Sequence, residues 1–272
     1  MPFPPSIPQR ARGTRVAGKV VIVTGGNAGI GQATAELLAR EGAVVVIAAR
    51  STKSGEVAAA EIRDAGEVAH FIQTDVSHEA ACEQLVAETV RRFGKIDVLI
   101  NNAAIYPRGT LTETTIDFWR KIMATNLEGP FVLCRACVPH MVRQGGGSII
   151  NVGSANGLGG GANLTAYSTS KGGLLTLTRN IAATYAREGI RANYLIPGWN
   201  ITETEIVTQA QEGHDSAWIE KAALRQPAGR VSVPADAAYA MLWLASDESV
   251  FVNGAIINTD GGSAVLPNAR RD

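Results

Sequence analysis

Short runs of β-branched residues alternate with longer amphipathic stretches along this chain. A run such as VVIVT at 20–24 is typical of a buried parallel strand, because both faces of such a strand are covered. The stretches between these runs carry apolar residues at helical spacing and predict helices. The pattern predicts strands near 20–24, 43–49, 68–73, 97–101, 147–153, 190–196 and 255–258, and helices near 29–41, 53–65, 77–93, 114–144 (with a break near Asn126), 164–188 and 234–246.

Strict alternation of strand and helix predicts an α/β fold. We expect a Rossmann-like, doubly wound parallel sheet of about seven strands in a three-layer α/β/α arrangement. The segment 199–228 interrupts the alternation and is expected to form a lid helix over the substrate. The length of 272 residues suits a single domain, expected at 18–266, with a flexible tail at 1–17 and a second tail at 267–272.

Composition excludes several classes of function. The 25 basic and 25 acidic residues give no net charge, so no basic surface invites nucleic acid. No apolar run approaches the ~20 residues of a membrane helix, and the first residues lack the apolar region of a secretory signal. We therefore expect a cytoplasmic protein. The three cysteines, at 82, 134 and 137, do not make a disulfide framework, and Cys134 and Cys137, which form a CxxC on an apolar helix, are expected to be reduced and buried rather than a redox pair. The four histidines lack metal-ligand spacing, so no metal is expected.

A glycine-rich turn, TGGNAGIG at 24–31, follows the first strand and opens a helix. This context is the one that a dinucleotide site requires. Gly25 would allow the tight turn, Gly29 the approach of a pyrophosphate, and Gly31 close packing of the helix. The free N–H groups and the positive dipole end of the helix would face the phosphates. The spacing is GxxxGxG rather than the more common GxGxxG.

The end of the second strand predicts which dinucleotide binds. NAD sites usually place an acidic residue there, ~20 residues after the glycine turn, to bind the ribose 2′-hydroxyl. This chain has Ala49, then Arg50 and Ser51. A guanidinium can bind a 2′-phosphate by charge-assisted hydrogen bonds, so we expect NADP(H). Because Asn27 stands where a second basic residue would help, use of NAD(H) as well is the fallback.

Tyr167 and Lys171 carry the predicted chemistry. Four residues apart on one helix, they share a face. A tyrosine of pKa ~10 is a poor base, but a nearby ammonium and an oxidised nicotinamide would both favour the phenolate. Ser154 ends a strand at the carboxyl edge of the sheet, where α/β proteins bind ligands. The three residues predict a proton-transferring phenol with a hydroxyl that holds the reacting oxygen.

The motifs together resemble those of the short-chain dehydrogenase/reductase superfamily in its single-domain form, from about Lys19 to Gly262. They are TGxxxGIG at 24–31, Asp75, NNA at 101–103, Asn126, Ser154, YxxxK at 167–171, and PG at 197–198 with Thr202. One departure is Ala104, where the family usually has Gly.

The resemblance implies a role for each motif. Asp75 and Val76 would line the adenine, and Asn101 would support the central strand and the cofactor. Thr202 would hold the nicotinamide carboxamide. Asn126 would hold a water that links Lys171 to solvent, and Lys171 would bind the ribose. The implied catalytic set is Asn126, Ser154, Tyr167 and Lys171; the implied cofactor set is Gly25, Asn27, Gly29, Ile30, Gly31, Arg50, Ser51, Asp75, Val76, Asn102, Ala103, Tyr167, Lys171, Pro197, Gly198 and Thr202.

The substrate is less well defined by the sequence. Ser154, Asn156 and Trp199 are its expected contacts. The segment GLGGGANL at 157–164 has no charge, which argues against a carboxylate or phosphate held there. Arg108 could bind an anionic group, although a solvated loop arginine is the simpler interpretation.

Two classes of function fit these observations. The first is an NADP-dependent oxidoreductase that interconverts a ketone or aldehyde and an alcohol. The second is a nucleotide-binding regulatory or scaffold protein on the same fold, without turnover; the intact catalytic motifs favour the first. The helices after Asn126 and around Tyr167 are apolar on more than one face. Because related enzymes pair these helices across a two-fold axis, we expect a homotetramer.

Overall fold

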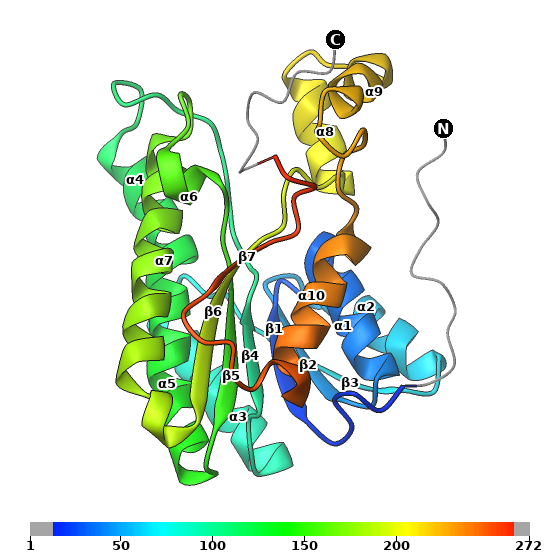
Figure 1. Cartoon of the computed structure of the whole chain (residues 1–272), viewed down its shortest axis with the longest axis vertical. Helices are drawn as coiled ribbons and strands as arrows, with labels where there is room; N and C mark the ends of the chain where they lie inside the picture. The colour runs from blue at the N-terminus through cyan, green and yellow to red at the C-terminus, as the bar shows by residue number, and fades with distance from the viewer. Residues whose placement is uncertain (1–12, 264–272) are drawn as a thin grey trace.

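A seven-stranded parallel sheet forms the centre of the molecule (Figure 1). The structure is a computed structural model, and it describes residues 13–263. The strand order is β3-β2-β1-β4-β5-β6-β7, so the direction of winding reverses between β1 and β4. All seven strands lie where the sequence predicts them: β1 Val20–Thr24, β2 Val44–Ala49, β3 Val68–Gln73, β4 Val98–Asn101, β5 Gly147–Val152, β6 Ile190–Ile196 and β7 Ile256–Asn258.

Helices cover both faces of the sheet. One face packs against α1, α2 and α10, and the other against α3, α5 and α7 (Figure 1). This arrangement confirms the three-layer, doubly wound fold. The helices are α1 Gly29–Arg40, α2 Thr52–Asp64, α3 Glu79–Phe93, α4 Ile116–Met123, α5 Gly129–Arg143, α6 Asn156–Gly159, α7 Thr165–Thr184, α8 Glu203–Gln211, α9 Ser216–Leu224 and α10 Pro234–Ala245; short 3-10 turns lie at Ala186–Glu188 and Asp247–Ser249.

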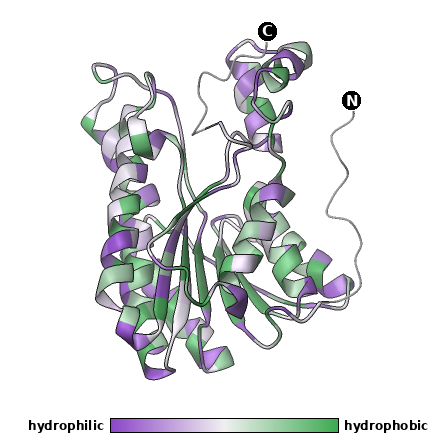
Figure 2. Ribbon diagram, in the orientation of Figure 1, coloured by the Kyte–Doolittle hydropathy of each residue, from purple (hydrophilic) through white to green (hydrophobic). Residues whose placement is uncertain are grey.

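The central strands are buried on both faces, as their continuous apolar sequences predict. Every residue of β1 is at most 2% exposed. Apolar residues concentrate in the strands and on the helix faces that meet them (Figure 2). Burial of this kind stabilises a fold by ~25 cal/mol for each Å² of apolar surface removed from water. The sheet is therefore a rigid base for the loops at its carboxyl edge.

The predicted break near Asn126 is a π-helical turn. It spans Ala124–Glu128 and joins α4 to α5. The turn buries Asn126 completely and changes the direction of side chains between the two helices. Single π-turns of this kind often occur at functional sites.

The lid segment differs from the sequence prediction. It contains two helices, α8 and α9, rather than one. Gly213 ends the first with a left-handed φ of 84°, and Asp215 begins the second by accepting a hydrogen bond from the Trp218 N–H at 2.8 Å. A glycine followed closely by an N-capping aspartate is a recognised helix boundary, and the prediction overlooked it.

The packed chain also begins earlier than expected. Residues 1–12 of the predicted first tail, and all of 267–272, lie outside the described residues. Within 13–17, which the prediction assigned to the tail, Val16 is fully buried. The Arg15 guanidinium binds the Glu248 carboxylate at 2.6 Å. This segment is therefore part of the folded body.

The cysteine prediction is confirmed, because Cys82, Cys134 and Cys137 are all free and buried. In the described part of the chain, none of the helices is both long and apolar enough to cross a membrane.

Candidate active site

A large cavity opens at the carboxyl edge of the sheet. Its volume is about 1640 Å³, whereas pockets for drug-sized ligands span about 300–1,000 Å³. The space therefore suits an extended dinucleotide together with a substrate. Of the site residues predicted from the sequence, all except Gly31 and Asn126 line this cavity.

The glycine turn has the backbone that its sequence predicts. Gly25 and Gly29 have φ values of 64° and 53°, in the left-handed region that favours glycine. A Cβ added to Gly31 would lie 2.1 Å from the Gly25 carbonyl oxygen. Only glycine therefore allows α1 to pack this closely against the turn. Helix α1 has no side-chain cap and no acidic residue in its first turn. Its positive end therefore suits a pyrophosphate.

Arg50 lies at the cavity, exposed, directly after the buried Ala49. Beside it, Ser51 caps α2 by accepting a hydrogen bond from the Ser54 N–H at 3.3 Å. The Asn27 amide donates to the Ser54 hydroxyl at 2.9 Å, which ties the glycine turn to this cap. A guanidinium and a second helix N-terminus thus converge where a 2′-phosphate would bind.

The Asp75 carboxyl lies close enough to Arg50 to respond to its charge. Burial raises the pKa of Asp75, but hydrogen bonds from Ser77 and the nearby charges outweigh it, and the net direction is down. A charged carboxylate at this place suits its predicted position beside the adenine.

The ends of β1 and β4 are locked together. The Thr24 hydroxyl accepts hydrogen bonds from the Asn102 and Ala103 N–H groups, each at 3.0 Å. The Asn102 amide donates to the Thr24 carbonyl at 2.9 Å. Asn101 instead donates to the Asn151 side chain at 2.8 Å. Asn101 therefore supports the strand, as expected, but it does not line the cavity.

Ser154 and Tyr167 meet in the cavity. The Ser154 hydroxyl hydrogen-bonds the Tyr167 phenol. Burial raises the pKa of Tyr167, the Ser154 hydrogen bond lowers it, and the nearby Tyr106 and Glu205 raise it further. The net direction is up, and Lys171 is not among the groups that shift it, so the lowering of this pKa by Lys171 and an oxidised nicotinamide stays a prediction.

The Lys171 ammonium is buried against a backbone carbonyl. It donates to the Val152 carbonyl at 2.6 Å and lies 5.9 Å from the centre of the Tyr167 ring. Burial lowers the pKa of Lys171 itself to about 8. The ammonium is therefore held by a neutral carbonyl, with no carboxylate among the described residues to compensate its burial.

Tyr194 is a residue of the site that sequence reasoning missed. Its hydroxyl accepts a hydrogen bond from the Ser154 N–H at 2.9 Å and lies 3.1 Å from the Lys171 carbonyl oxygen. Burial raises the pKa of this fully buried phenol to about 12. A Cβ on Gly153 would lie 1.9 Å from its ring. The available signal was a tyrosine in a strand next to the one that ends before Gly153.

The Asn126 side chain holds the loop after β4. Its oxygen accepts from the Ile105 N–H at 2.9 Å, and its nitrogen donates to the Ile105 carbonyl at 2.8 Å and to the Ser170 hydroxyl at 3.2 Å. Because the side chain is committed to these partners, the water-mediated link to Lys171 stays a prediction.

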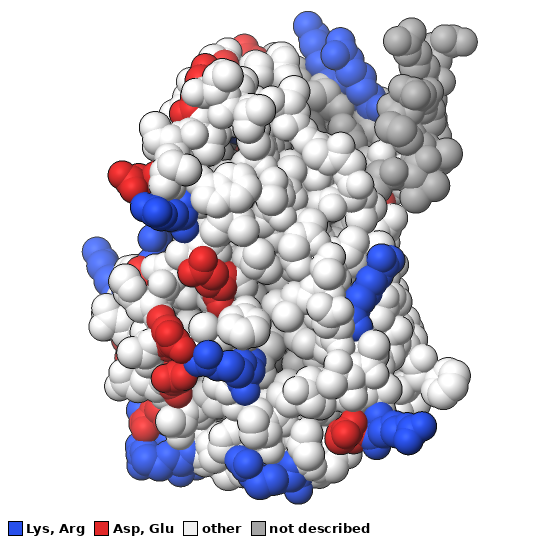
Figure 3. All heavy atoms as spheres, turned by 90° about the vertical axis from the view of Figure 1, so that its left-hand side faces the viewer, with Lys and Arg blue, Asp and Glu red and all other residues white. Residues whose placement is uncertain are grey.

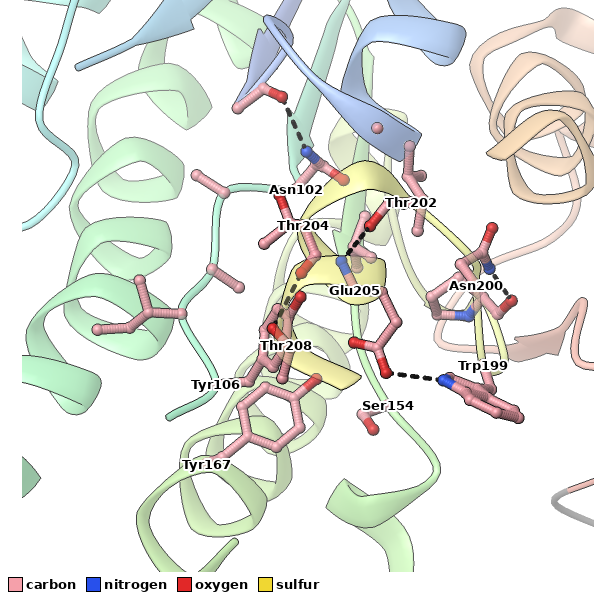
Figure 4. A pocket seen from close by; sticks show the side chains of 18 of the residues that line it. Asn102, Tyr106, Ser154, Tyr167, Trp199, Asn200, Thr202, Thr204, Glu205 and Thr208 are labelled. Atoms are coloured by element: carbon pink, nitrogen blue, oxygen red, sulfur yellow. Dashed lines mark hydrogen bonds between the residues drawn. The ribbon is translucent and has the colours of Figure 1, made fainter. Parts of the chain in front are cut away.

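The lid contributes an unexpected carboxylate. Glu205 is only 7% exposed, and it accepts hydrogen bonds from the Trp199 indole and the Gln209 amide, both at 2.8 Å. Its side chain lies beside those of Tyr106, Tyr167 and Ser154 (Figure 4). Sequence reasoning overlooked Glu205 because an acidic residue in the first turn of a helix is ordinary.

Arg108 pairs with the lid. Its Nε lies 2.7 Å from a Glu212 carboxylate oxygen, and both side chains are about one-third exposed. Arg108 is therefore neither a solvated loop arginine nor free to bind an anionic substrate. The loop after β4 and the end of α8 are joined across the cavity by this pair.

Thr202 joins the lid to the glycine turn. Its hydroxyl accepts from the Glu205 N–H at 3.1 Å and so caps α8. A Cβ on Gly29 would lie 3.1 Å from the Thr202 methyl carbon. Asn156 lies beside Ser154, with its N–H donating to the Ser154 hydroxyl at 3.2 Å.

Comparison with known proteins agrees with this geometry. The family model described as Enoyl-(Acyl carrier protein) reductase matches residues 25–264. The chain belongs to the short-chain dehydrogenase/reductase superfamily. Within this superfamily, cis-4-hydroxycyclohexanecarboxylate dehydrogenase of Sinomonas cyclohexanicum is 40% identical over 251 residues, which cover 92% of this chain and 98% of that protein.

Two further members bear on the cofactor. NADP-dependent (R)-specific alcohol dehydrogenase of Lentilactobacillus kefiri is 38% identical, over 91% of this chain and 97% of that protein. A crystal structure provisionally assigned as an NAD(P)-dependent gluconate 5-dehydrogenase of Beutenbergia cavernae, with NADP bound at low occupancy, has a TM-score of 0.85 and 33% identity, and the match covers 92% of this chain and 98% of that one. The chain is an oxidoreductase of the type that acts on CH–OH groups.

Proposed function

We propose that this protein interconverts an alcohol and a ketone or aldehyde with NADP(H). The observation that carries the proposal is the convergence of Ser154, Tyr167 and Lys171 beside the glycine turn in one cavity. A nucleotide-binding protein without turnover would have no need of this arrangement. The named relatives, which are alcohol dehydrogenases, support the same interpretation.

Each catalytic residue has a distinct part in the reaction. When bound, the nicotinamide cofactor exchanges a hydride with the substrate carbon. Ser154 hydrogen-bonds the reacting oxygen, and Tyr167 donates a proton to it in reduction or removes one in oxidation. Lys171 binds the ribose hydroxyls. The protein, through Tyr167, thus transfers the proton of the alcohol.

The preference for NADP(H) rests on Arg50 and on the missing acidic residue. Arg50 is exposed at the cavity next to the capped N-terminus of α2, and Ala49 offers no acceptor for a free 2′-hydroxyl. A relative named NADP-dependent and a neighbouring structure with NADP bound give further support. Binding of NAD(H) as well is the alternative, because Asn27 adds no second positive charge.

Arg50→Ala tests this preference. A charge-assisted hydrogen bond contributes ~1.5–3 kcal/mol, so the affinity for NADP should fall roughly tenfold to a hundredfold, while the affinity for NAD should change little. Lys53→Ala, which removes an exposed cation in the first turn of α2 but outside the cavity, is the matched control. An unchanged affinity for NADP in Arg50→Ala would make Arg50 an ordinary surface residue.

Turnover itself is tested by absorbance at the nicotinamide band with a panel of ketones and alcohols and with both cofactors. Turnover with NADP(H) is expected. Tight nucleotide binding without turnover of any ketone or alcohol in the panel would favour the regulatory or scaffold alternative. The cytoplasmic location and the single-domain organisation stay predictions.

We also propose a homotetramer. Uncharged side chains cover most of the face formed by α4, α5 and α7 (Figure 3). This face exposes Ile116 at 62%, Phe131 at 45% and Val142 at 39%. Apolar side chains gathered on one face are typical of a protein–protein interface.

A further inference from the structure

Glu205 is a buried carboxylate in the part of the cavity that faces the reacting groups. It lies close enough to Tyr167 and Tyr106 for its charge to raise the pKa of both phenols. Among the described residues that line the cavity, the other acidic side chains are those of Asp75, Asp260 and Glu212, and they are engaged by Ser77, the Gly262 N–H and Arg108 respectively. Glu205 is therefore the acidic group that a bound substrate would meet near Tyr167.

The hydrogen bonds from Trp199 and Gln209 hold this side chain in the lid, but they leave its charge without a cation. Glu205 is the third residue of α8, where a glutamate commonly reaches back to the N-cap N–H. Here the carboxylate points into the cavity instead (Figure 4). No ion pair to Glu205 is present among the described residues, and an unpaired buried carboxylate is costly to a fold. Such a cost is more often retained at a binding site than in a scaffold.

The carboxylate keeps capacity for a ligand. One oxygen accepts from the Trp199 indole and the Gln209 amide, and the Tyr106 hydroxyl is a third neighbour. An ionised carboxylate has about four acceptor positions. A donor on the substrate can therefore be accepted without displacing the protein's own hydrogen bonds.

We propose that Glu205 accepts a hydrogen bond from a second hydroxyl of the substrate, close to the carbon that reacts. The substrate class is then a diol or a hydroxyketone. This inference rests on the proposed function, since it assigns the substrate of the same site. Glu205 selects the substrate, and Ser154 and Tyr167 carry out the chemistry.

The surroundings favour a neutral hydroxyl over an anionic group. A carboxylate on the substrate would be repelled by Glu205, and Arg108 is already paired with Glu212. An ammonium is the other natural partner of a carboxylate, and the test therefore compares an amino alcohol with the diols. The cavity walls also carry Asn156, Thr204 and Thr208, whose side chains both donate and accept. A hydroxyl, which does the same, complements them.

The test compares matched alcohols in the oxidation direction with NADP⁺. The substrates are cyclohexanol, cis- and trans-1,2-cyclohexanediol, 2-aminocyclohexanol and 2-hydroxycyclohexanecarboxylate. For the wild type, kcat/KM should be at least about tenfold higher for one of the diols than for cyclohexanol, because the hydrogen bond is charge-assisted. Glu205→Gln keeps an acceptor for Trp199 and should reduce this ratio several-fold, and Glu205→Leu should abolish it.

Glu203→Gln is the matched control, since Glu203 lies on the same helix but is exposed and outside the cavity. It should keep the wild-type ratio. Binding of the diols to Tyr167→Phe loaded with NADP⁺, measured by calorimetry, gives a readout without turnover. There, a Glu205→Leu substitution should weaken diol binding by about tenfold.

Three results would overturn the inference. They are equal ratios in the wild type and the Glu205 variants, a preference of the wild type for the amino alcohol or the hydroxy acid, and diol binding that Glu205→Leu leaves unchanged. In each case turnover of cyclohexanol would keep the proposed function intact. If the wild type turned over no alcohol or ketone with either cofactor, the proposed function itself would fail.

Discussion

At the scale of the residue, the catalytic groups are buried in a way that costs stability. Lys171 is 2% exposed, and burial lowers its pKa to about 8. Desolvation penalises a charged ammonium unless an anion compensates it. Here the partner is a neutral carbonyl, so the folded state holds a lysine that is less basic than in the unfolded chain.

This shift predicts a pH dependence of stability. A lowered pKa in the folded state means that the unfolded chain binds more protons between pH 8 and about 10.5. The free energy of unfolding should therefore rise with pH across this window. At pH 7, Lys171→Met should abolish turnover but raise the free energy of unfolding, by ~3 kcal/mol at most.

Denaturant titrations at pH 7 and pH 10 measure this effect. The difference in the free energy of unfolding between Lys171→Met and the wild type should be smaller at pH 10 than at pH 7. A variant that is less stable than the wild type at pH 7 would contradict the assignment of the penalty to Lys171.

Tyr194 supports the backbone of two catalytic residues through one hydroxyl. Tyr194→Phe should leave the Ser154 N–H buried without this acceptor, at a cost of ~1–3 kcal/mol in stability. Because Ser154 and Lys171 would lose their common brace, kcat should fall about tenfold. The KM for the cofactor should change less, since Tyr194 does not line the cavity.

Tyr185→Phe, at a half-buried tyrosine that lies outside the cavity, is the control for the loss of a phenolic hydroxyl. Equal losses of kcat and of cofactor affinity in Tyr194→Phe would indicate general destabilisation rather than positioning.

At the scale of the element, the sequence predicted the strands and the glycine turn well. VVIVT and VVVIAA are buried on both faces, so their local pattern and their tertiary environment agree. The site residues were found because each follows a strand end or shares a helix face. Glu205 and Tyr194 were missed because their roles depend on contacts between segments far apart in sequence, which periodicity does not encode. The two-helix lid was missed although Gly213 and Asp215 mark its boundary.

The lid should be held closed by the pair between Arg108 and Glu212. Both side chains are partly exposed, and such pairs contribute roughly 0.2–1 kcal/mol. Arg108→Ala should therefore raise the KM of the substrate by a factor of a few, with little change in cofactor affinity. The double charge reversal Arg108→Glu with Glu212→Arg should restore part of the loss. No recovery in the double variant would mean that the pair does not hold the lid.

At the scale of the whole molecule, the sheet brings residues from distant parts of the chain to one edge, while α5 and α7 leave a mostly uncharged face outside (Figure 3). Burial of this face in a tetramer should yield a sedimentation coefficient that does not change over micromolar concentrations. Phe131→Glu places a charge on this face and should shift the protein toward smaller species. A stable monomer in the wild type would contradict the proposed tetramer.

The central claim is that the cavity oxidises or reduces a substrate through Tyr167. The most direct measurement is the turnover of Tyr167→Phe, followed at the nicotinamide absorbance band, together with its affinity for NADP(H). Loss of a general acid or base typically costs 10²–10⁴-fold. We expect at least a ~100-fold fall in kcat with the fold and cofactor binding retained. Near-normal turnover in a folded, cofactor-binding Tyr167→Phe variant would contradict the account.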